Sequence, residues 1–132
     1  MPVVVDASIV LAPALEKDAV KSVAMLAAIQ QNSWVVPALW WFEIRNVLVV
    51  NERRGRVTQQ ETERFLGRVS QTTVNVDDAP DEATVMALAR RHRLTVYDAA
   101  YLELALREGV PLATLDAALA QAARREGVAV LE

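Results

Sequence analysis

The sequence predicts an α/β fold in which a mostly parallel sheet of about five strands lies between two layers of helices. Three observations predict this three-layer α/β/α sandwich. Short apolar runs without polar alternation are typical of strands that are buried on both faces. Longer segments with helical spacing separate these runs, which favours parallel strands joined by right-handed crossovers. The 132 residues are 53% hydrophobic and 23% charged, which is enough apolar material for one core.

Apolar runs rich in β-branched residues and leucine predict the strands. In chain order, the expected strands are Val3–Val5, Trp34–Val36, Val74–Val76, Leu112–Leu115 and Val128–Leu131. We find no linker, repeat or low-complexity tract between them, and we therefore expect a single domain that spans residues 1–132.

Helical spacing and end signals predict the helices. The expected helices are Asp18–Gln31, Ala38–Arg54, Thr58–Ser70, Asp81–His92, Asp98–Glu108 and Ala117–Glu126. Thr58 is followed three residues later by Glu61, the pattern of a capping box at a helix start. Gly55 and Gly109 come directly after expected helix ends, where glycine is favoured.

The composition excludes several kinds of chemistry. The chain has no cysteine and one histidine, His92, which excludes disulfides, thiolate nucleophiles, cysteine-bound metals and sites with several histidines in one chain. The net charge of −3 and the pI of about 5.2 neither support nor exclude binding to nucleic acid. The N-terminal segment has no basic residue before Asp6, and no apolar run approaches the ~20 residues that span a bilayer, so we expect a soluble, cytoplasmic protein.

Four carboxylates stand where such a fold places chemistry. Asp6 and Asp116 follow expected strands, Asp98 opens an expected helix, and Glu43 lies within a strongly apolar helix. Ligands of open α/β sheets bind beyond the carboxyl ends of the strands, so these side chains are expected to converge at one edge. Clustered carboxylates repel one another unless a cation or protons compensate them. Oxygen ligands suit Mg²⁺ or Mn²⁺, and such a site favours phosphoryl chemistry.

Each acid also has an ordinary structural interpretation. Asp98 and Asp116 are in positions that cap helices, Asp6 is in the position of an ordinary acid after a strand, and Glu43 is a candidate for an ion pair with an arginine. These alternatives stay open for each acid taken singly. The four acids together favour the metal site.

The sequence resembles the PIN domains, and specifically the VapC ribonuclease toxins of prokaryotic toxin–antitoxin pairs. The resemblance runs the whole length of the chain and rests on Val4-Val-Asp6-Ala-Ser8, on Glu43, on Thr95-Val-Tyr-Asp98-Ala-Ala-Tyr-Leu-Glu-Leu-Ala, and on Ala113-Thr-Leu-Asp116-Ala-Ala-Leu. The third of these is the most specific. The order and spacing of the four acids also fit the family.

The resemblance implies a PIN-like sandwich and a metal-dependent endoribonuclease that cleaves RNA phosphodiester bonds. It also implies inhibition by a VapB-type antitoxin and a homodimer. The positions that match the family's Mg²⁺ or Mn²⁺ ligands and catalytic acids are Asp6, Glu43, Asp98 and Asp116, and Ser8 and Thr114 match positions that support the site through hydroxyl hydrogen bonds.

Two other classes of function remain open from the sequence. One is a phosphate-handling enzyme with a related sheet, such as a receiver domain or a HAD-type phosphatase, although the further acid that either class needs beside Asp6 is absent. The other is a non-catalytic binding module that keeps the fold. The helix that contains Trp40 and Trp41 is apolar nearly all round, which favours a surface for a partner chain. We interpret His92 as a surface residue at a helix end, with a contact to a phosphate of RNA as the alternative. Whether Arg45 pairs with an acid or contacts RNA stays open.

Overall fold

The computed structural model describes residues 1–15 and 20–131, which form a five-stranded parallel sheet in the order β3-β2-β1-β4-β5. The strands are β1 (Pro2–Val5), β2 (Ser33–Pro37), β3 (Val74–Asp77), β4 (Leu112–Ala113) and β5 (Val130–Leu131). Val3, Val4 and Val5 are fully buried. This follows because β1 is the central strand and both of its faces are covered. The expected sandwich is confirmed, and its sheet is parallel throughout.

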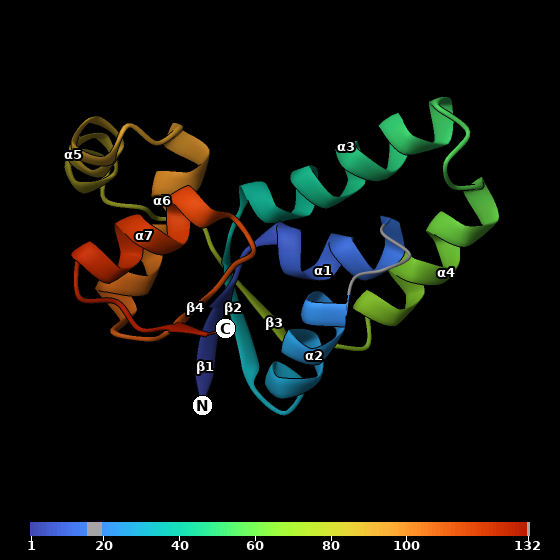
Figure 1. Cartoon of the computed structure of the whole chain (residues 1–132), viewed down its shortest axis with the longest axis horizontal. Helices are drawn as coiled ribbons and strands as arrows, with labels where there is room; N and C mark the ends of the chain where they lie inside the picture. Colours follow the sequence, from blue (N-terminus) through green and yellow to red (C-terminus); the bar gives the residue numbers. More distant parts are fainter. Residues whose placement is uncertain (16–19, 132) are drawn as a thin grey trace.

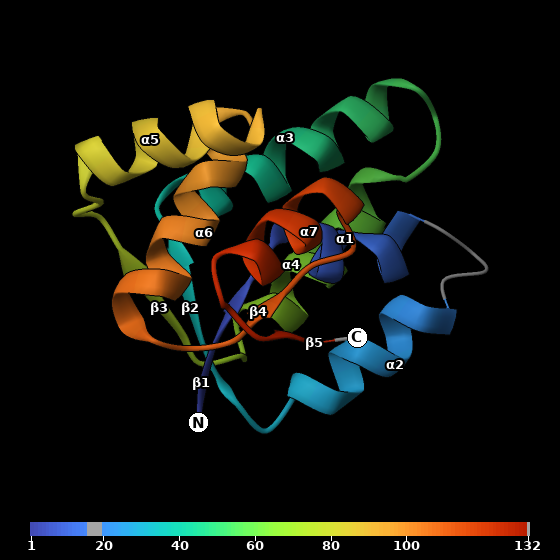
Figure 2. The ribbon, with the colours of Figure 1, turned by 60° about the vertical axis from the view of Figure 1, so that its left-hand side comes forward.

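The helices lie in two layers, one on each face of the sheet (Figure 1). They are α1 (Ala7–Leu15), α2 (Val20–Ile29), α3 (Leu39–Arg53), α4 (Gln59–Val69), α5 (Glu82–His92), α6 (Val96–Glu108) and α7 (Ala117–Arg125). Helices α1 to α4 connect the first three strands on one face, and α5 to α7 lie on the other, where Figure 2 brings α6 and α7 in front of the strands. Within the described ranges, no helix is both long and apolar enough to cross a membrane.

Helix α1 is an element that the sequence analysis did not predict. It contains Pro13, which has no N–H for the helical hydrogen bond to the residue four positions earlier, and such a residue usually argues against a helix. Its buried residues also follow one another closely, from Ile9 to Ala12, so the helical spacing of apolar residues is hidden. Burial of this helix between the sheet and its neighbours outweighs the poor local signal.

The start of helix α6 differs from the expected one. Helix α6 begins at Val96 because the hydroxyl of Thr95 accepts a hydrogen bond from the Asp98 N–H (3.1 Å). The interpretation of Asp98 as a cap is therefore wrong, and Thr95 caps the helix. The capping box at Thr58 is confirmed, with both hydrogen bonds to Glu61 at 3.0 Å. The expected start of the first predicted helix, Asp18, lies outside the described residues.

The last two strands are shorter than expected, and β4 ends at Ala113 rather than Leu115. Beyond Ala113 the chain bonds to side chains instead of to a neighbouring strand: the Leu115 N–H donates to the hydroxyl of Ser8 (3.1 Å). The sheet pairing of this segment therefore ends directly after β4, and the residues that follow form part of the candidate site.

Candidate active site

The candidate site lies where the strand order reverses. β1 and β4 are neighbours, but the chain leaves β1 toward β2 and leaves β4 toward β5, on opposite sides. Such a reversal opens a crevice beyond the carboxyl ends of the two strands. Asp6 follows β1, and its N–H donates to the carbonyl of Ala113 in β4 (3.0 Å). Residues 108 positions apart, Asp6 and Thr114, therefore meet at one edge of the sheet.

Two neutral hydroxyl groups hold the Asp6 carboxylate, which is only 6% exposed. Ser8 Oγ and Thr114 Oγ1 donate to the same oxygen, Oδ2, at 2.8 and 2.7 Å. Thr114 Oγ1 also accepts from the Asp116 N–H (3.0 Å). Burial raises the pKa of Asp6 most, and the charge of Asp116 adds to this effect, whereas the two hydroxyl hydrogen bonds oppose it.

Asp116 combines a structural position with a place at the site. Its Oδ1 accepts the Leu119 N–H (2.9 Å), so it caps α7 as its ordinary interpretation predicts. Its charge also raises the pKa of both Asp6 and Asp98. Capping and membership of the acidic cluster therefore coexist in this residue.

Glu43 and Asp98 reach the site from two helices on opposite faces of the sheet. Glu43 of α3 is half-buried, and the hydroxyl of the fully buried Tyr101 donates to its Oε1 (2.5 Å). Burial raises the pKa of Glu43 first, followed by the charges of Asp6 and Asp98. The pKa of Asp98 is also raised by burial, and then by the charges of Asp116 and Asp6. The four acids are thus electrostatic neighbours.

None of the ion pairs formed within residues 1–15 and 20–131 includes these four acids. Arg45, the nearest arginine in the sequence to Glu43, lies over the ring of Trp41 at 4.0 Å and donates to its carbonyl (3.2 Å). The alternative of a Glu43–arginine pair is therefore wrong for the described part of the chain. As the side chains stand, no three His, Cys, Asp or Glu residues of that part are grouped closely enough to hold a metal ion by themselves.

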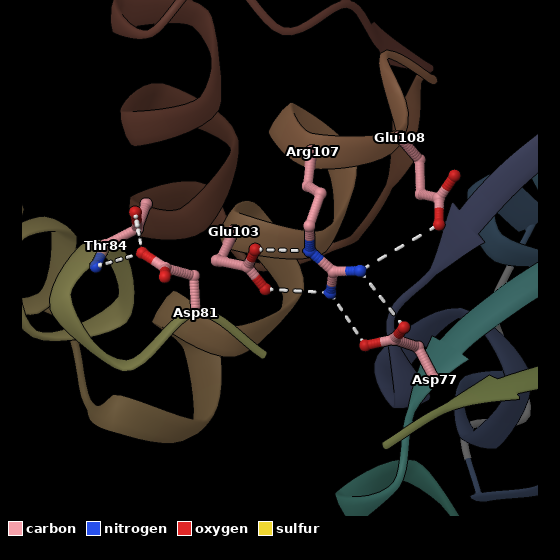
Figure 3. Close-up of polar contacts among 6 residues, drawn as sticks. All are labelled: Asp77, Asp81, Thr84, Glu103, Arg107 and Glu108. Carbon is pink, nitrogen blue, oxygen red and sulfur yellow. Dashed lines mark hydrogen bonds and ion pairs between the residues drawn. The ribbon is translucent and has the colours of Figure 1, made fainter. Parts of the chain in front are cut away.

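Raised pKa values distinguish Asp6, Glu43 and Asp98 from Asp77, Asp81 and Glu126, whose pKa values are lowered. Arg107 donates to both oxygens of Glu103 (2.7 and 3.0 Å) and to both oxygens of Asp77 (3.1 and 2.7 Å), as Figure 3 shows. This arginine holds the pKa of Asp77 below its usual range. The network ties the end of α6 to the end of β3, while Asp81 in the same view caps α5 through Thr84.

His92 is not the surface residue that the sequence analysis expected. Its side chain is 6% exposed, and Nε2 lies 2.6 Å from Glu126, which also accepts from Arg91 (2.7 Å). His92 and Arg91 hold the pKa of Glu126 below its usual range. This contact joins α5 to the end of α7 and leaves His92 no role in the acidic cluster.

Tyr101 is the site residue that sequence reasoning missed. The signal was present, because Tyr101 follows Asp98 by three positions and a helix places such residues on one face. What the sequence did not provide was its partner Glu43, which is 58 residues away. The pKa of the Tyr101 hydroxyl is raised by burial and by Glu43, so the group stays protonated and acts as a donor.

Comparison with solved structures finds the same fold. The structure of PAE2754 from Pyrobaculum aerophilum has 27% identity and a TM-score of 0.74, and the match covers 98% of this chain and 89% of that chain. FitAcB from Neisseria gonorrhoeae has 18% identity and a TM-score of 0.70, with 98% and 96% covered. VapBC2 from Rickettsia felis, solved bound to a DNA fragment from the promoter, has 12% identity and a TM-score of 0.64, with 99% and 98% covered.

No curated protein matches the sequence significantly. The family comparison is decisive instead, because residues 3–125 match the model described as PIN domain, and this range contains all four acids and both supporting hydroxyl residues. The receiver and HAD-type alternatives are therefore set aside. The chain belongs to the PIN domain family.

Proposed function

We propose that this protein is a divalent-metal-dependent endoribonuclease that acts as the toxin of a VapBC-type toxin–antitoxin pair. The observation that carries the proposal is the set of four carboxylates at the β1–β4 edge, none of which forms an ion pair within residues 1–15 and 20–131, while neutral hydroxyl groups donate to Asp6 and Glu43. PIN domains are generally nucleases, which supports hydrolysis of phosphodiester bonds. The choice of RNA rests on the resemblance of the sequence motifs to VapC toxins.

The donor set of the site fits Mg²⁺ or Mn²⁺. Asp6, Glu43, Asp98 and Asp116 offer only oxygen atoms. The pKa values of Asp6, Glu43 and Asp98 are raised, by burial first and then by the charges of neighbouring acids, as expected where negative charge is not compensated. Mg²⁺ keeps several of its waters and is bound by one or two carboxylates together with substrate phosphates. The absence of three closely grouped ligands within the described ranges is therefore compatible with such a metal.

In the proposed mechanism, the residues of this chain position the metal and the substrate phosphate. A divalent ion held by these carboxylates would supply positive charge to polarise the phosphodiester and to activate water for attack. Ser8 and Thr114 fix the orientation of Asp6, and Tyr101 fixes Glu43 from the opposite face of the sheet. Asp98 and Asp116 complete the negative field that attracts the cation.

The proposed antitoxin partner is supported by an apolar hollow in the surface of the molecule. A hollow of about 430 Å³ lies between α1, α2 and α4. Its lining is mainly apolar and includes Val10, Pro13, Val23, Leu26 and Phe65. Such a hollow suits an apolar side of a partner helix. Two solved relatives, VapBC2 and FitAB, carry the names of paired proteins and were solved with DNA.

A homodimer and a cytoplasmic location complete the proposal. Trp41, Phe42 and Val49 of α3 are 48%, 67% and 39% exposed, so this helix offers an apolar surface to a second copy. The proposed RNA substrate and antitoxin are cytoplasmic molecules. The alternative of a non-catalytic binding module predicts the same surface but no cleavage.

The test is cleavage of a pool of cellular RNA by the purified protein, with Mg²⁺ or Mn²⁺ and with EDTA. We expect metal-dependent cleavage that Asp6→Asn and Asp98→Asn abolish. Asp81→Asn is the matched control, because Asp81 only caps α5 and asparagine caps equally well. Cleavage that survives EDTA contradicts the metal mechanism, and a metal-binding protein that cleaves no RNA of the pool favours the binding module.

A further inference from the structure

Within the described residues, Glu43 is held by a single hydrogen-bond donor, which comes from a different helix. It lies on α3 between the exposed Phe42 and the fully buried Ile44, so its side chain starts at the boundary of the core. Arg45 is engaged with Trp41 and does not hold it. In the described part of the chain, the Glu43 carboxylate accepts one hydrogen bond, from the Tyr101 hydroxyl, at 2.5 Å.

Tyr101 is itself held firmly. It is fully buried, and it lies one helical turn after Asp98, so a single helix presents an acid of the site and the donor to a second acid. The far end of α6 is anchored to β3 by Arg107, which limits sliding of the helix. The hydroxyl therefore occupies a fixed point relative to Asp98.

The chemical type of this donor matters. An arginine in its place would cancel the charge of Glu43, whereas a tyrosine hydroxyl orients one oxygen and leaves the negative charge for a cation. The same choice recurs at Asp6, where Ser8 and Thr114 donate. Residues that orient a metal ligand in this way commonly change metal affinity when they are removed.

We propose that Tyr101 is a positioning residue that orients the Glu43 carboxylate for a divalent cation while preserving its charge. This inference rests on the metal site proposed above. Tyr101 does not touch the reacting phosphate in this proposal, and it acts only through Glu43.

The test is Tyr101→Phe, which removes the hydroxyl and keeps the buried ring. The matched control is Tyr97→Phe, which removes the same group from an exposed tyrosine of the same helix. We expect the Mg²⁺ dissociation constant, measured from the metal dependence of thermal melts, to rise about tenfold or more in Tyr101→Phe and to stay unchanged in the control. RNA cleavage by Tyr101→Phe is expected to recover at high Mg²⁺.

A double-mutant cycle separates positioning from simple stabilisation. In a Glu43→Gln background, Tyr101→Phe is expected to change Mg²⁺ affinity by less than twofold, because its effect passes through the carboxylate. A purely structural hydroxyl predicts a lower melting temperature without metal and an unchanged Mg²⁺ dissociation constant. That result, with metal binding intact in the wild type, overturns the role of Tyr101 and leaves the proposed function standing. A wild type that binds no Mg²⁺ overturns both.

A spectroscopic measurement covers the case in which Tyr101→Phe does not fold. The chain has two tyrosines, so Tyr97→Phe leaves Tyr101 as the single one, and 3-fluorotyrosine then reports on it alone by ¹⁹F NMR. We expect its resonance to shift and saturate with added Mg²⁺, and the shift to be lost with Glu43→Gln. A resonance that does not move while melts show Mg²⁺ binding contradicts the proposal.

Discussion

At the Asp6 carboxylate, two hydroxyl donors oppose burial and the charge of Asp116, and the net effect is a raised pKa. Asp77 and Glu126 show the opposite behaviour, since Arg107 lowers the pKa of one and His92 and Arg91 lower that of the other. Asp77 and Glu126 thus have cationic partners, whereas, within the part of the chain that the structure describes, Asp6 and Glu43 have neutral hydroxyl donors. This difference makes stability measurements informative about the site.

The first prediction concerns pH in the absence of metal. Because the folded-state pKa of Asp6 is raised, its contribution to stability is fully present below the unfolded pKa near ~4 and is lost as pH rises through the folded pKa. Asp6→Asn removes this loss. The melting temperature of the mutant in EDTA, relative to wild type, is therefore expected to increase as pH rises above ~4. A difference that is constant over this range contradicts the raised pKa.

The second prediction uses metal at neutral pH. We expect Asp6→Asn in EDTA to be as stable as wild type or more stable. Added Mg²⁺ should stabilise wild type by about 2.7 kcal/mol at 100 times its dissociation constant, and the mutant much less. If Asp6 were instead the buried partner of an arginine, the mutation would cost about 3–5 kcal/mol with or without metal. Thermal melts of both proteins, with EDTA and with Mg²⁺, distinguish the two cases.

The sequence indicated the acids but not the residues that hold some of them. Each acid ends an apolar run or interrupts one, which is a local signal, and the motifs around Asp6, Asp98 and Asp116 also include Ser8 and Thr114. The donor to Glu43 comes from 58 residues away, and a pairing over that distance has no local signature. The burial of His92 was not predicted for the same reason, because its partner Glu126 lies 34 residues later in the sequence.

Among the elements, α6 has the largest role in the site. Its first turn carries Asp98, its middle carries Tyr101, and its end carries the pair of Glu103 and Arg107. Glu103 is 1% exposed, and a buried charge of this kind is costly without its partner. The helix is therefore fixed at both ends, by the Thr95 cap and by Arg107.

The third prediction tests this anchor. Arg107→Met removes the partner of a buried carboxylate, and we expect it to lower the free energy of unfolding by about 3 kcal/mol. Arg91→Met is the control, because Arg91 is 58% exposed in its pair with Glu126 and such pairs contribute at most about 1 kcal/mol. Urea unfolding of both variants gives the comparison. If both variants lose the same small amount of unfolding free energy, the Arg107–Glu103 pair contributes no more to stability than an exposed ion pair.

The elements also show where sequence patterns stop predicting the fold. The strands and six of the helices have clear periodicity or end signals, and the structure contains them with shifts of a few residues. Helix α1 lacks both signals, since Pro13 interrupts it and its buried positions run together. Its helical state depends on burial by the rest of the molecule, which a local pattern does not contain.

At the scale of the whole molecule, two apolar surfaces are candidates for contact with partner chains. One is the hollow between α1, α2 and α4, and the other is the exposed side of α3. The first is proposed for the antitoxin and the second for a second copy of the chain. Single substitutions at the two surfaces separate these assignments.

The fourth prediction concerns the antitoxin surface. Val23 lines the hollow and is 54% exposed, so Val23→Glu places a charge in it without disturbing the core. We expect this variant to lose co-purification with the product of the neighbouring gene when the two are expressed together. Val76→Glu is the matched control, since Val76 is 56% exposed on the edge strand β3. Retained binding by Val23→Glu argues against the hollow as the docking surface.

The fifth prediction concerns assembly. Light scattering at micromolar concentration is expected to give the mass of a dimer for the wild type. Val49→Glu on α3 should shift the protein toward the monomer, and Val76→Glu should leave the mass unchanged. A wild type that is monomeric at these concentrations contradicts the dimer proposal.

The neighbouring positions of β1 and β4 also bear on how the protein is synthesised. Asp6 emerges from the ribosome early, but its donor Thr114 is translated 108 residues later. At about 5–20 residues per second, that interval lasts roughly 5 to 20 seconds. During this time the nascent chain lacks both Thr114 and Asp116, so the acidic edge is incomplete. The acidic edge therefore forms only after Asp116 has been synthesised, and the proposed nuclease cannot act before then.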